Sequence, residues 1–159
     1  TNNSRKLSEE FMNQEQINNM KLENQLCFPL YAVSRLVTNT YTQFLKPFGL
    51  TYTQYIVFLV LWEKDGITVG QLCEKLYLDN GTITPIIKKM QTQGYLERKR
   101  SSHDDRIVII NLTDKGKELQ EKVKNVPKLM SECVELSDDK KMQLYKLLKE
   151  FLKNKCDKK

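Results

Sequence analysis

The stretch over residues 68–94, TVGQLCEKLYLDNGTITPIIKKMQTQG, decides the fold. Thr68 predicts the N-cap of a short helix over residues 69–76. A polar turn at residues 79–81 separates this helix from a second one over residues 82–93, and the glycine that follows predicts its end. A short helix, a turn and a second helix form the pattern of a helix-turn-helix.

The segment that comes next changes from helical to strand periodicity. Residues 95–100, YLERKR, and residues 106–112, RIVIINL, predict two strands. The polar residues 101–105 between them predict the loop of a hairpin. A hairpin directly after a helix-turn-helix indicates a winged helix-turn-helix.

Longer helices flank this central unit. Apolar residues recur at helical spacing over residues 22–45, 51–64, 113–126 and 137–153. We therefore expect a mainly α fold with a small β wing in one integrated domain. Its expected parts are a flexible N-terminal extension (1–15), an N-terminal dimerisation helix (16–50), a winged helix-turn-helix DNA-binding region (51–112) and C-terminal dimerisation helices (113–159).

The terminal helices are apolar along one face, and a domain of this size offers little surface to cover them. Packing of two copies across a two-fold axis would bury these faces and place two reading helices against successive major-groove faces. We therefore expect a homodimer that binds a palindromic operator. The alternative is an intramolecular helical cap.

Composition limits the class of protein. The chain has 159 residues, 40% hydrophobic and 29% charged, which is typical of a soluble globular domain. No apolar run approaches the roughly 20 residues that a membrane span needs, and the N-terminus lacks a secretory apolar segment. We expect a cytoplasmic protein with no membrane partner. The net charge of +6 is compatible with a nucleic-acid partner.

The chemistry-bearing residues disfavour an enzyme. The four cysteines are far apart and form no CxxC pair, so the spacing of a zinc site is absent. His103 is the only histidine, and every catalytic triad or His-based metal centre would have to use it. We expect no catalytic residues, no metal and no cofactor.

Hydroxyls, amides and cations gather on the second helix of the motif and on the wing. Hydroxyls and amides bond base edges, lysines neutralise phosphates, and a wing arginine can enter a minor groove. The expected DNA-binding residues are Thr82, Thr84, Lys88, Lys89, Arg98, Lys99, Arg100 and Arg106. The alternative is an ordinary solvated helix face with an incidental basic wing.

Three motifs carry a resemblance to a known family. LYLDNGTITP at residues 76–85, KRSSHDDR at residues 99–106 and Leu112-Thr113 followed by Gly116 resemble the MarR family of regulators. Within that family, LENQLCF at residues 22–28, followed by Leu30-Tyr31, is similar to the OhrR-like branch, which senses oxidation through a thiol. The resemblance covers about residues 20 to 125.

The resemblance implies a MarR-type dimer that holds DNA while one cysteine is reduced and releases it on oxidation. The redox-sensing position falls on Cys27. The tyrosines that surround this thiol, partly from the partner subunit, fall on Tyr31, Tyr41 and Tyr52. In two-cysteine relatives a second thiol forms an intersubunit disulfide, and Cys133 is the possible resolving residue.

The residues themselves agree with oxidant sensing. Pro29 is best tolerated in a first turn, so the main helix either starts near Phe28 or is kinked just after Cys27, and both place Cys27 in a helix N-terminal region. The thiolate form attacks peroxides, and a helix N-terminus stabilises such an anion. Phe28, Leu30 and Phe58 are expected to form an apolar surround that favours an organic hydroperoxide. Cys73, in the short helix, is expected in the core. The alternatives are a repressor released by a small aromatic ligand and a thiol peroxidase.

Overall fold

The computed structural model describes residues 16–100 and 107–156 and leaves residues 1–15, 101–106 and 157–159 outside the description. The chain divides into two compact units, Thr1–Val123 and Lys124–Lys159. The expected extension at residues 1–15 and the expected wing loop at 101–105 lie outside the described residues.

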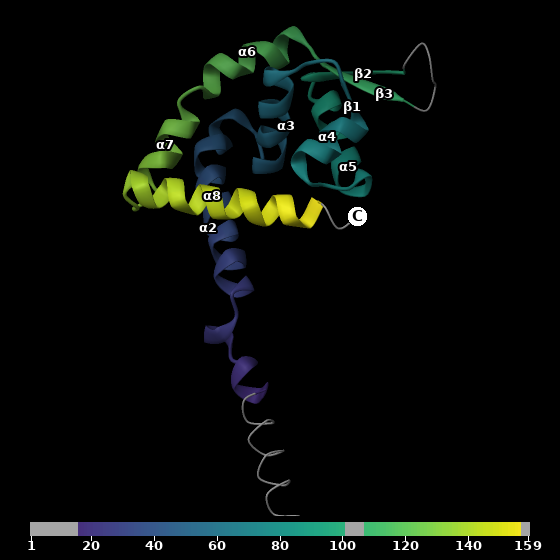
Figure 1. The fold of residues 1–159 in the computed structure, drawn as a ribbon. Coiled ribbons are helices and arrows are strands. Elements are labelled where there is room, and N and C mark those ends of the chain that lie inside the picture. Colours follow the sequence, from purple (N-terminus) through teal and green to yellow (C-terminus); the bar gives the residue numbers. More distant parts are fainter. Residues whose placement is uncertain (1–15, 101–106, 157–159) are drawn as a thin grey trace, which may run out of the picture. The chain divides into compact units, whose positions relative to one another are not determined.

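The first unit carries most of the secondary structure (Figure 1). Its elements are η1 (Leu22–Asn24), α2 (Cys27–Leu45), η2 (Lys46–Phe48), α3 (Tyr52–Glu63), β1 (Ile67–Thr68), α4 (Val69–Leu76), α5 (Asn80–Thr92), β2 (Leu96–Arg100), β3 (Val108–Leu112) and α6 (Asp114–Val123). The second unit contains α7 (Val126–Glu132) and α8 (Asp138–Cys156). The expected mainly α fold with a small β wing is confirmed.

Two threonines set the starts of α3 and α4. Thr51 accepts a hydrogen bond from the backbone N–H of Gln54, and the Gln54 side chain accepts one from the Thr51 backbone. Thr68 and Gln71 make the same reciprocal pair at the start of α4. These capping boxes satisfy backbone donors that the first turn of a helix leaves without partners.

The sheet has three antiparallel strands in the order β1-β3-β2. Leu96 of β2 lies opposite Leu112 of β3, and Arg98 lies opposite Ile110. Figure 1 shows α3, α4 and α5 gathered beside the sheet, while β2 and β3 run out beyond them. The arrangement is a winged helix-turn-helix, as the sequence predicts.

The core of this unit forms between the three helices and the sheet. Its fully buried side chains include Phe58 and Leu61 of α3, Leu72 of α4, Ile83 and Ile87 of α5, and Ile110 of β3. No single helix among the described residues is long and apolar enough to cross a membrane. The bent pair of α2 and α3 passes together by composition, but α3 is the buried core helix.

Several element boundaries differ from the sequence predictions, and one strand was not predicted. The helix expected from Thr82 begins at Asn80, because Asp79 accepts a hydrogen bond from the Thr82 N–H and acts as the N-cap. The helix expected over residues 113–126 ends at Val123, and Pro127 lies in the first turn of a separate helix, α7, where proline is tolerated. The two-residue strand β1 was not predicted.

Candidate functional site

Cys27 is the first residue of α2, and its side chain is exposed. Pro29 lies two residues further into the first turn, where the missing backbone N–H costs no intrahelical hydrogen bond. Of the two arrangements that Pro29 allows, the structure has the helix start rather than the kink. The backbone N–H groups of a first turn point toward the positive end of the helix dipole, which favours an anion.

Tyr31 and Arg35 follow Cys27 at intervals of four residues and so lie on the same face of α2. The Arg35 guanidinium donates a hydrogen bond from Nη1 to the Tyr31 hydroxyl at 3.1 Å and lies 5.6 Å from the centre of its ring. Because the Tyr31 hydroxyl accepts this hydrogen bond, it retains its own hydrogen as a donor. Sequence reasoning missed Arg35, although its spacing from Cys27 was a usable signal.

Tyr41 and Tyr52 lie together at the junction of α2 and α3. Their ring centres are 4.7 Å apart, and the ring of Tyr55 lies 5.7 Å from that of Tyr41. Burial raises the pKa of all three phenols, and Tyr55 reaches about 12 with added repulsion from Tyr41 and Tyr52. These phenols stay neutral donors across physiological pH.

The tyrosines expected around the thiol therefore form two groups within one chain. The fourteen residues from Cys27 to Tyr41 span about 21 Å of helix, well beyond hydrogen-bond reach. Tyr31 lies one turn from Cys27, whereas Tyr41 and Tyr52 lie near the other end of α2. A Cys27 environment containing all three tyrosines would need the partner subunit.

The expected apolar surround of Cys27 is partly wrong. Phe58 is fully buried and packs against Trp62, with ring centres 5.0 Å apart, and against Tyr95, at 5.4 Å. A side chain sealed into the core of α3 cannot flank an exposed thiol at the start of α2. Phe28 and Leu30 are exposed beside Cys27 and remain available for that role.

The other described thiols occupy different surroundings. Cys133 follows α7 as its exposed C-cap residue, in the second unit. Cys73 lies at the edge of the core rather than inside it, and its Sγ donates a hydrogen bond to Asn80 Oδ1 at 3.3 Å. Burial, with a contribution from Asp79, raises the pKa of the Cys73 thiol. Within the described residues, no three His, Cys, Asp or Glu side chains group as metal ligands.

The first turn of α5 is organised by its N-cap. Asp79 accepts hydrogen bonds from the Thr82 N–H at 2.8 Å and from the Thr82 hydroxyl at 2.9 Å, which lower the pKa of its carboxyl. The Thr82 hydroxyl is thus committed to the cap. Thr84 is partly exposed, and Lys88 and Lys89 are exposed further along the helix.

The cations of the wing differ in exposure. Lys99 and Arg100 of β2 are exposed, and Lys99 pairs with Glu97 at 3.0 Å. Arg98 lies on the face that carries the buried Leu96, so it points toward the helices. Arg106 lies outside the described residues.

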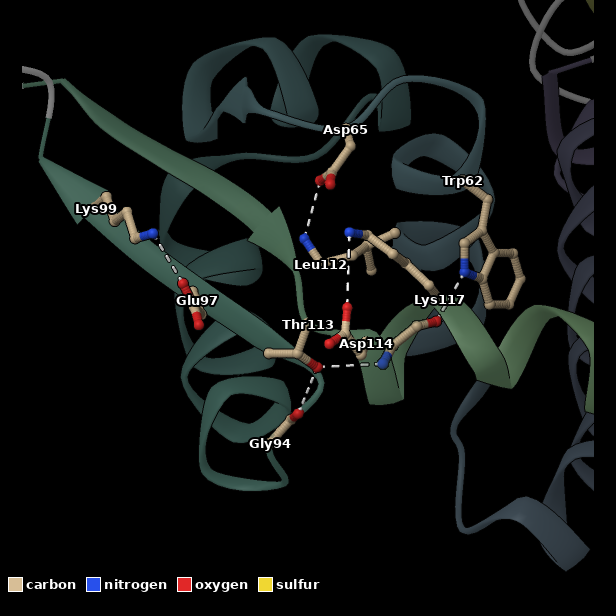
Figure 2. Close-up of polar contacts among 10 residues, drawn as sticks. Trp62, Asp65, Gly94, Glu97, Lys99, Leu112, Thr113, Asp114 and Lys117 are labelled. Atoms are coloured by element: carbon tan, nitrogen blue, oxygen red, sulfur yellow. Dashed lines mark hydrogen bonds and ion pairs between the residues drawn. The ribbon is translucent and has the colours of Figure 1, made fainter.

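Polar contacts hold the base of the wing to the helices (Figure 2). Asp65 Oδ1 accepts a hydrogen bond from the Leu112 N–H at 2.9 Å, and the Thr113 hydroxyl donates to the Gly94 carbonyl at 2.7 Å. The Trp62 indole N–H donates to the Gly116 carbonyl at 3.0 Å. These contacts fix the wing relative to α3 and to the end of α5.

The comparisons with known proteins agree on one family. The model of the transcriptional regulator SarA/Rot family matches residues 39–123. The organic hydroperoxide resistance transcriptional regulator of Bacillus subtilis is 48% identical over 114 residues, which cover 72% of this chain and 78% of the relative.

Solved structures of AbfR, a protein of Staphylococcus epidermidis, are also similar. Reduced AbfR bound to DNA has a TM-score of 0.72 at 39% identity, over 86% of this chain and 97% of AbfR. Overoxidised AbfR bound to DNA has the same TM-score at 40% identity, over 89% and 98%. The disulfide form of AbfR has a TM-score of 0.63 at 39% identity, over 91% and 97%.

Proposed function

Because the chain belongs to the SarA/Rot family of MarR-like transcriptional regulators, we propose that it is a DNA-binding repressor controlled by oxidation of Cys27. The oxidant is an organic hydroperoxide or a related oxidant. The observation that carries the proposal is the exposed thiol at the first residue of α2, followed one turn later by Tyr31.

DNA binding uses the helix-turn-helix and the wing. Lys88 and Lys89 of α5 and Lys99 and Arg100 of β2 are exposed cations, and the described part of α5 contains no carboxylate. A helix with this composition can lie in a major groove while the wing contacts the adjacent backbone or minor groove. Two states of AbfR that are bound to DNA support this assignment.

The protein acts as a homodimer on a palindromic operator. On α2 and its N-cap residue, the exposed apolar side chains are Leu26, Phe28, Leu30, Tyr31, Val33 and Leu36. On α8, they are Met142, Leu144, Tyr145, Leu147, Leu148 and Phe151. Apolar faces of this extent on two helices favour burial against a second copy. A two-fold axis would then place the helix-turn-helix motifs of both subunits on one duplex.

The sensing step is a thiol oxidation. The Cys27 thiolate attacks the peroxide, the O–O bond breaks, and the products are a Cys27 sulfenic acid and an alcohol. The Cys133 thiol of the partner subunit then displaces the sulfenic oxygen, which leaves as water, and an intersubunit disulfide forms. In the reducing cytoplasm, where we place the protein, both thiols are restored by exchange.

We assign the release of DNA to the disulfide rather than to higher oxidation of Cys27. Overoxidised AbfR is bound to DNA, as reduced AbfR is, and a disulfide form also exists. A covalent link between the exposed Cys27 of one subunit and the exposed Cys133 of the other restrains the helices that connect to the two helix-turn-helix motifs. A change in the separation of the two helix-turn-helix motifs weakens the DNA contacts of both subunits at once.

The test treats the reduced protein with cumene hydroperoxide and follows DNA binding together with non-reducing electrophoresis. The wild type is expected to form a covalent dimer and lose its DNA affinity, and a dithiol should restore both. Cys27→Ser should neither crosslink nor respond, and Cys133→Ser should not crosslink. Cys73→Ser is the matched control and should behave as the wild type. A Cys27→Ser variant that still releases DNA would overturn the proposal.

A further inference from the structure

An open hollow of about 410 Å³ lies at the base of the wing, between α4, α5 and the sheet. Thr68 and Gly70 line it from the start of α4, Asn80 and Thr84 from the first turns of α5, and Arg98 from β2. We call it the wing-base hollow. Its polar lining comes from three separate elements that the tertiary fold brings together.

Arg98 is unusual among the cations of the wing. Its Nε is buried and has no hydrogen-bond partner among the described residues. The described residues that line the hollow include no carboxylate. Arg98 is only partly exposed, and it is the one charged residue among the described residues that line the hollow, so the hollow is electrostatically complementary to an anion.

The start of α4 adds to this complementarity. The first turn of a helix presents backbone N–H groups and the positive end of the helix dipole. Gly70 is the second residue of this turn, and a Cβ built there would come no closer than 3.8 Å, to Thr68 Oγ1. The glycine therefore leaves room for a group to approach the backbone.

We propose that the wing-base hollow binds one phosphate of the DNA backbone, a role that rests on the proposed DNA-binding function. Arg98 donates to the phosphate from one side, and the start of α4 does so from the other. Asn80 and Thr84 supply side-chain donors from α5, the helix proposed to lie in the major groove. This assignment places the phosphate between the two elements that contact the duplex.

Under this proposal the cations of the wing have two different roles in DNA binding. A phosphate contact at Arg98 fixes the register of α5 on the duplex without reading sequence. Lys99 and Arg100, on the opposite face or nearer the loop, remain the groove-facing cations. Arg98 thus supports affinity for every duplex to a similar extent.

The experiment measures binding of the reduced full-length protein to two fluorescein-labelled duplexes over a range of salt concentrations. One duplex is selected by the wild type from a random pool, and the other has a scrambled sequence. The variants are Arg98→Gln and Gly70→Asp. Gly70→Asn is the neutral control for the aspartate, and Lys75→Gln, at the far end of α4, is the control for loss of one positive charge.

Arg98→Gln should weaken binding to both duplexes by the same factor, about tenfold, because one charge-assisted contact is lost. The slope of the logarithm of the binding constant against the logarithm of the salt concentration should decrease in magnitude by about one for each hollow that binds a phosphate. Gly70→Asp should weaken binding further than Gly70→Asn while preserving stability, because an aspartate in a first turn favours the helix.

The phosphate site would be overturned if Arg98→Gln bound DNA with the affinity and salt dependence of the wild type. It would also be overturned if Gly70→Asp and Gly70→Asn weakened binding equally. Either result would leave the proposed function intact. If Arg98→Gln does not fold, the two Gly70 variants decide the question alone. Failure of the wild type to bind either duplex would instead overturn the proposed function and the phosphate site with it.

Discussion

Gln54 Nε2 donates a hydrogen bond to Gln93 Oε1 at 2.9 Å, which joins the first turn of α3 to the C-cap of α5. Gln54 is only 2% exposed, and its Oε1 accepts a second hydrogen bond from the Thr51 N–H at 3.0 Å. One buried amide therefore fixes the start of α3 and the end of the proposed recognition helix. The same turn of α3 carries Tyr52 and Tyr55, so this amide joins the turn that holds two residues of the tyrosine cluster to the end of α5.

Removal of this amide should lower stability. Gln54→Met preserves the volume of the side chain but loses both hydrogen bonds, and we expect a loss of about 1–3 kcal/mol in the free energy of unfolding. Denaturant unfolding of Gln54→Met, Gln93→Ala and the double variant measures the coupling, which should be about 0.5–1.5 kcal/mol. Strict additivity of the two losses would show that the contact carries no energy.

Gly116 is expected to be intolerant of any side chain. A Cβ there would lie 2.4 Å from the Tyr95 carbonyl oxygen and 3.0 Å from Leu112 Cδ2. Gly116→Ala should therefore destabilise the first unit by about 1–3 kcal/mol, as overpacking of a close backbone contact does. Trp62 donates to the Gly116 carbonyl and is the only tryptophan, so its fluorescence should also shift.

Gly70→Ala is the control for this prediction. The nearest atom to a Cβ at Gly70 is 3.8 Å away, which is an ordinary contact. The substitution should leave the free energy of unfolding unchanged or slightly increased, because alanine favours a helix. Equal stability of the two alanine variants would contradict the close approach of α6 to Tyr95.

The parts of the fold that depend on local chemistry were predictable from sequence. Thr51 and Thr68 cap the helices that follow them, and Gly94 has a φ of +77°, the left-handed conformation that a glycine after a helix predicts. The position of Cys27 in the N-terminal region of a helix also follows from Pro29, because proline is best tolerated in a first turn.

The parts that depend on distant contacts were not predictable in the same way. β1 has two residues and exists because Ile67 pairs with Ile110, far along the chain. The burial of Phe58 depends on Trp62 and Tyr95, and no local pattern distinguishes it from a residue near the thiol. The inward direction of Arg98 was available from strand alternation with Leu96, but the basic character of the stretch YLERKR obscured it.

Alkaline pH should destabilise the first unit through its buried phenols. The pKa values of Tyr41, Tyr52 and Tyr55 are raised in the folded state, that of Tyr55 to about 12. The unfolded chain ionises near pH 10, so stability is fully present below about pH 10 and is lost as the pH rises toward 12. Tyr55→Phe should reduce the slope of stability against pH, as measured by denaturant unfolding at several alkaline pH values.

Acid pH should lower stability through Asp79, the N-cap residue of α5. The Asp79 carboxylate accepts the Thr82 hydrogen bonds, so its pKa is lowered in the folded state. Its contribution is present above the unfolded pKa of about 3.9 and is lost as the pH falls through the lower folded value. Asp79→Asn retains an N-cap but removes the charge, so its stability should vary less with pH in this range. Denaturant unfolding at several acid pH values measures this dependence. The same loss of stability with falling pH in the wild type and in Asp79→Asn would contradict this role.

The final prediction concerns the rate at which Cys27 reacts. Arg35 donates to the Tyr31 hydroxyl at 3.1 Å, and a phenol that accepts from a cation is a stronger donor through its own hydrogen. Tyr31 lies one turn from Cys27 on the same face of α2, and we expect the pair to stabilise negative charge at the sulfur. Tyr31→Phe and Arg35→Gln should each slow the reaction of reduced protein with cumene hydroperoxide about five- to tenfold, the worth of one hydrogen bond of about 1 kcal/mol. Stopped-flow measurement with excess peroxide gives the rate, and Arg35→Lys should recover part of it because the charge is kept. A double variant as slow as either single variant would place both residues in one path to the thiol, whereas unchanged rates would remove Arg35 from the sensor.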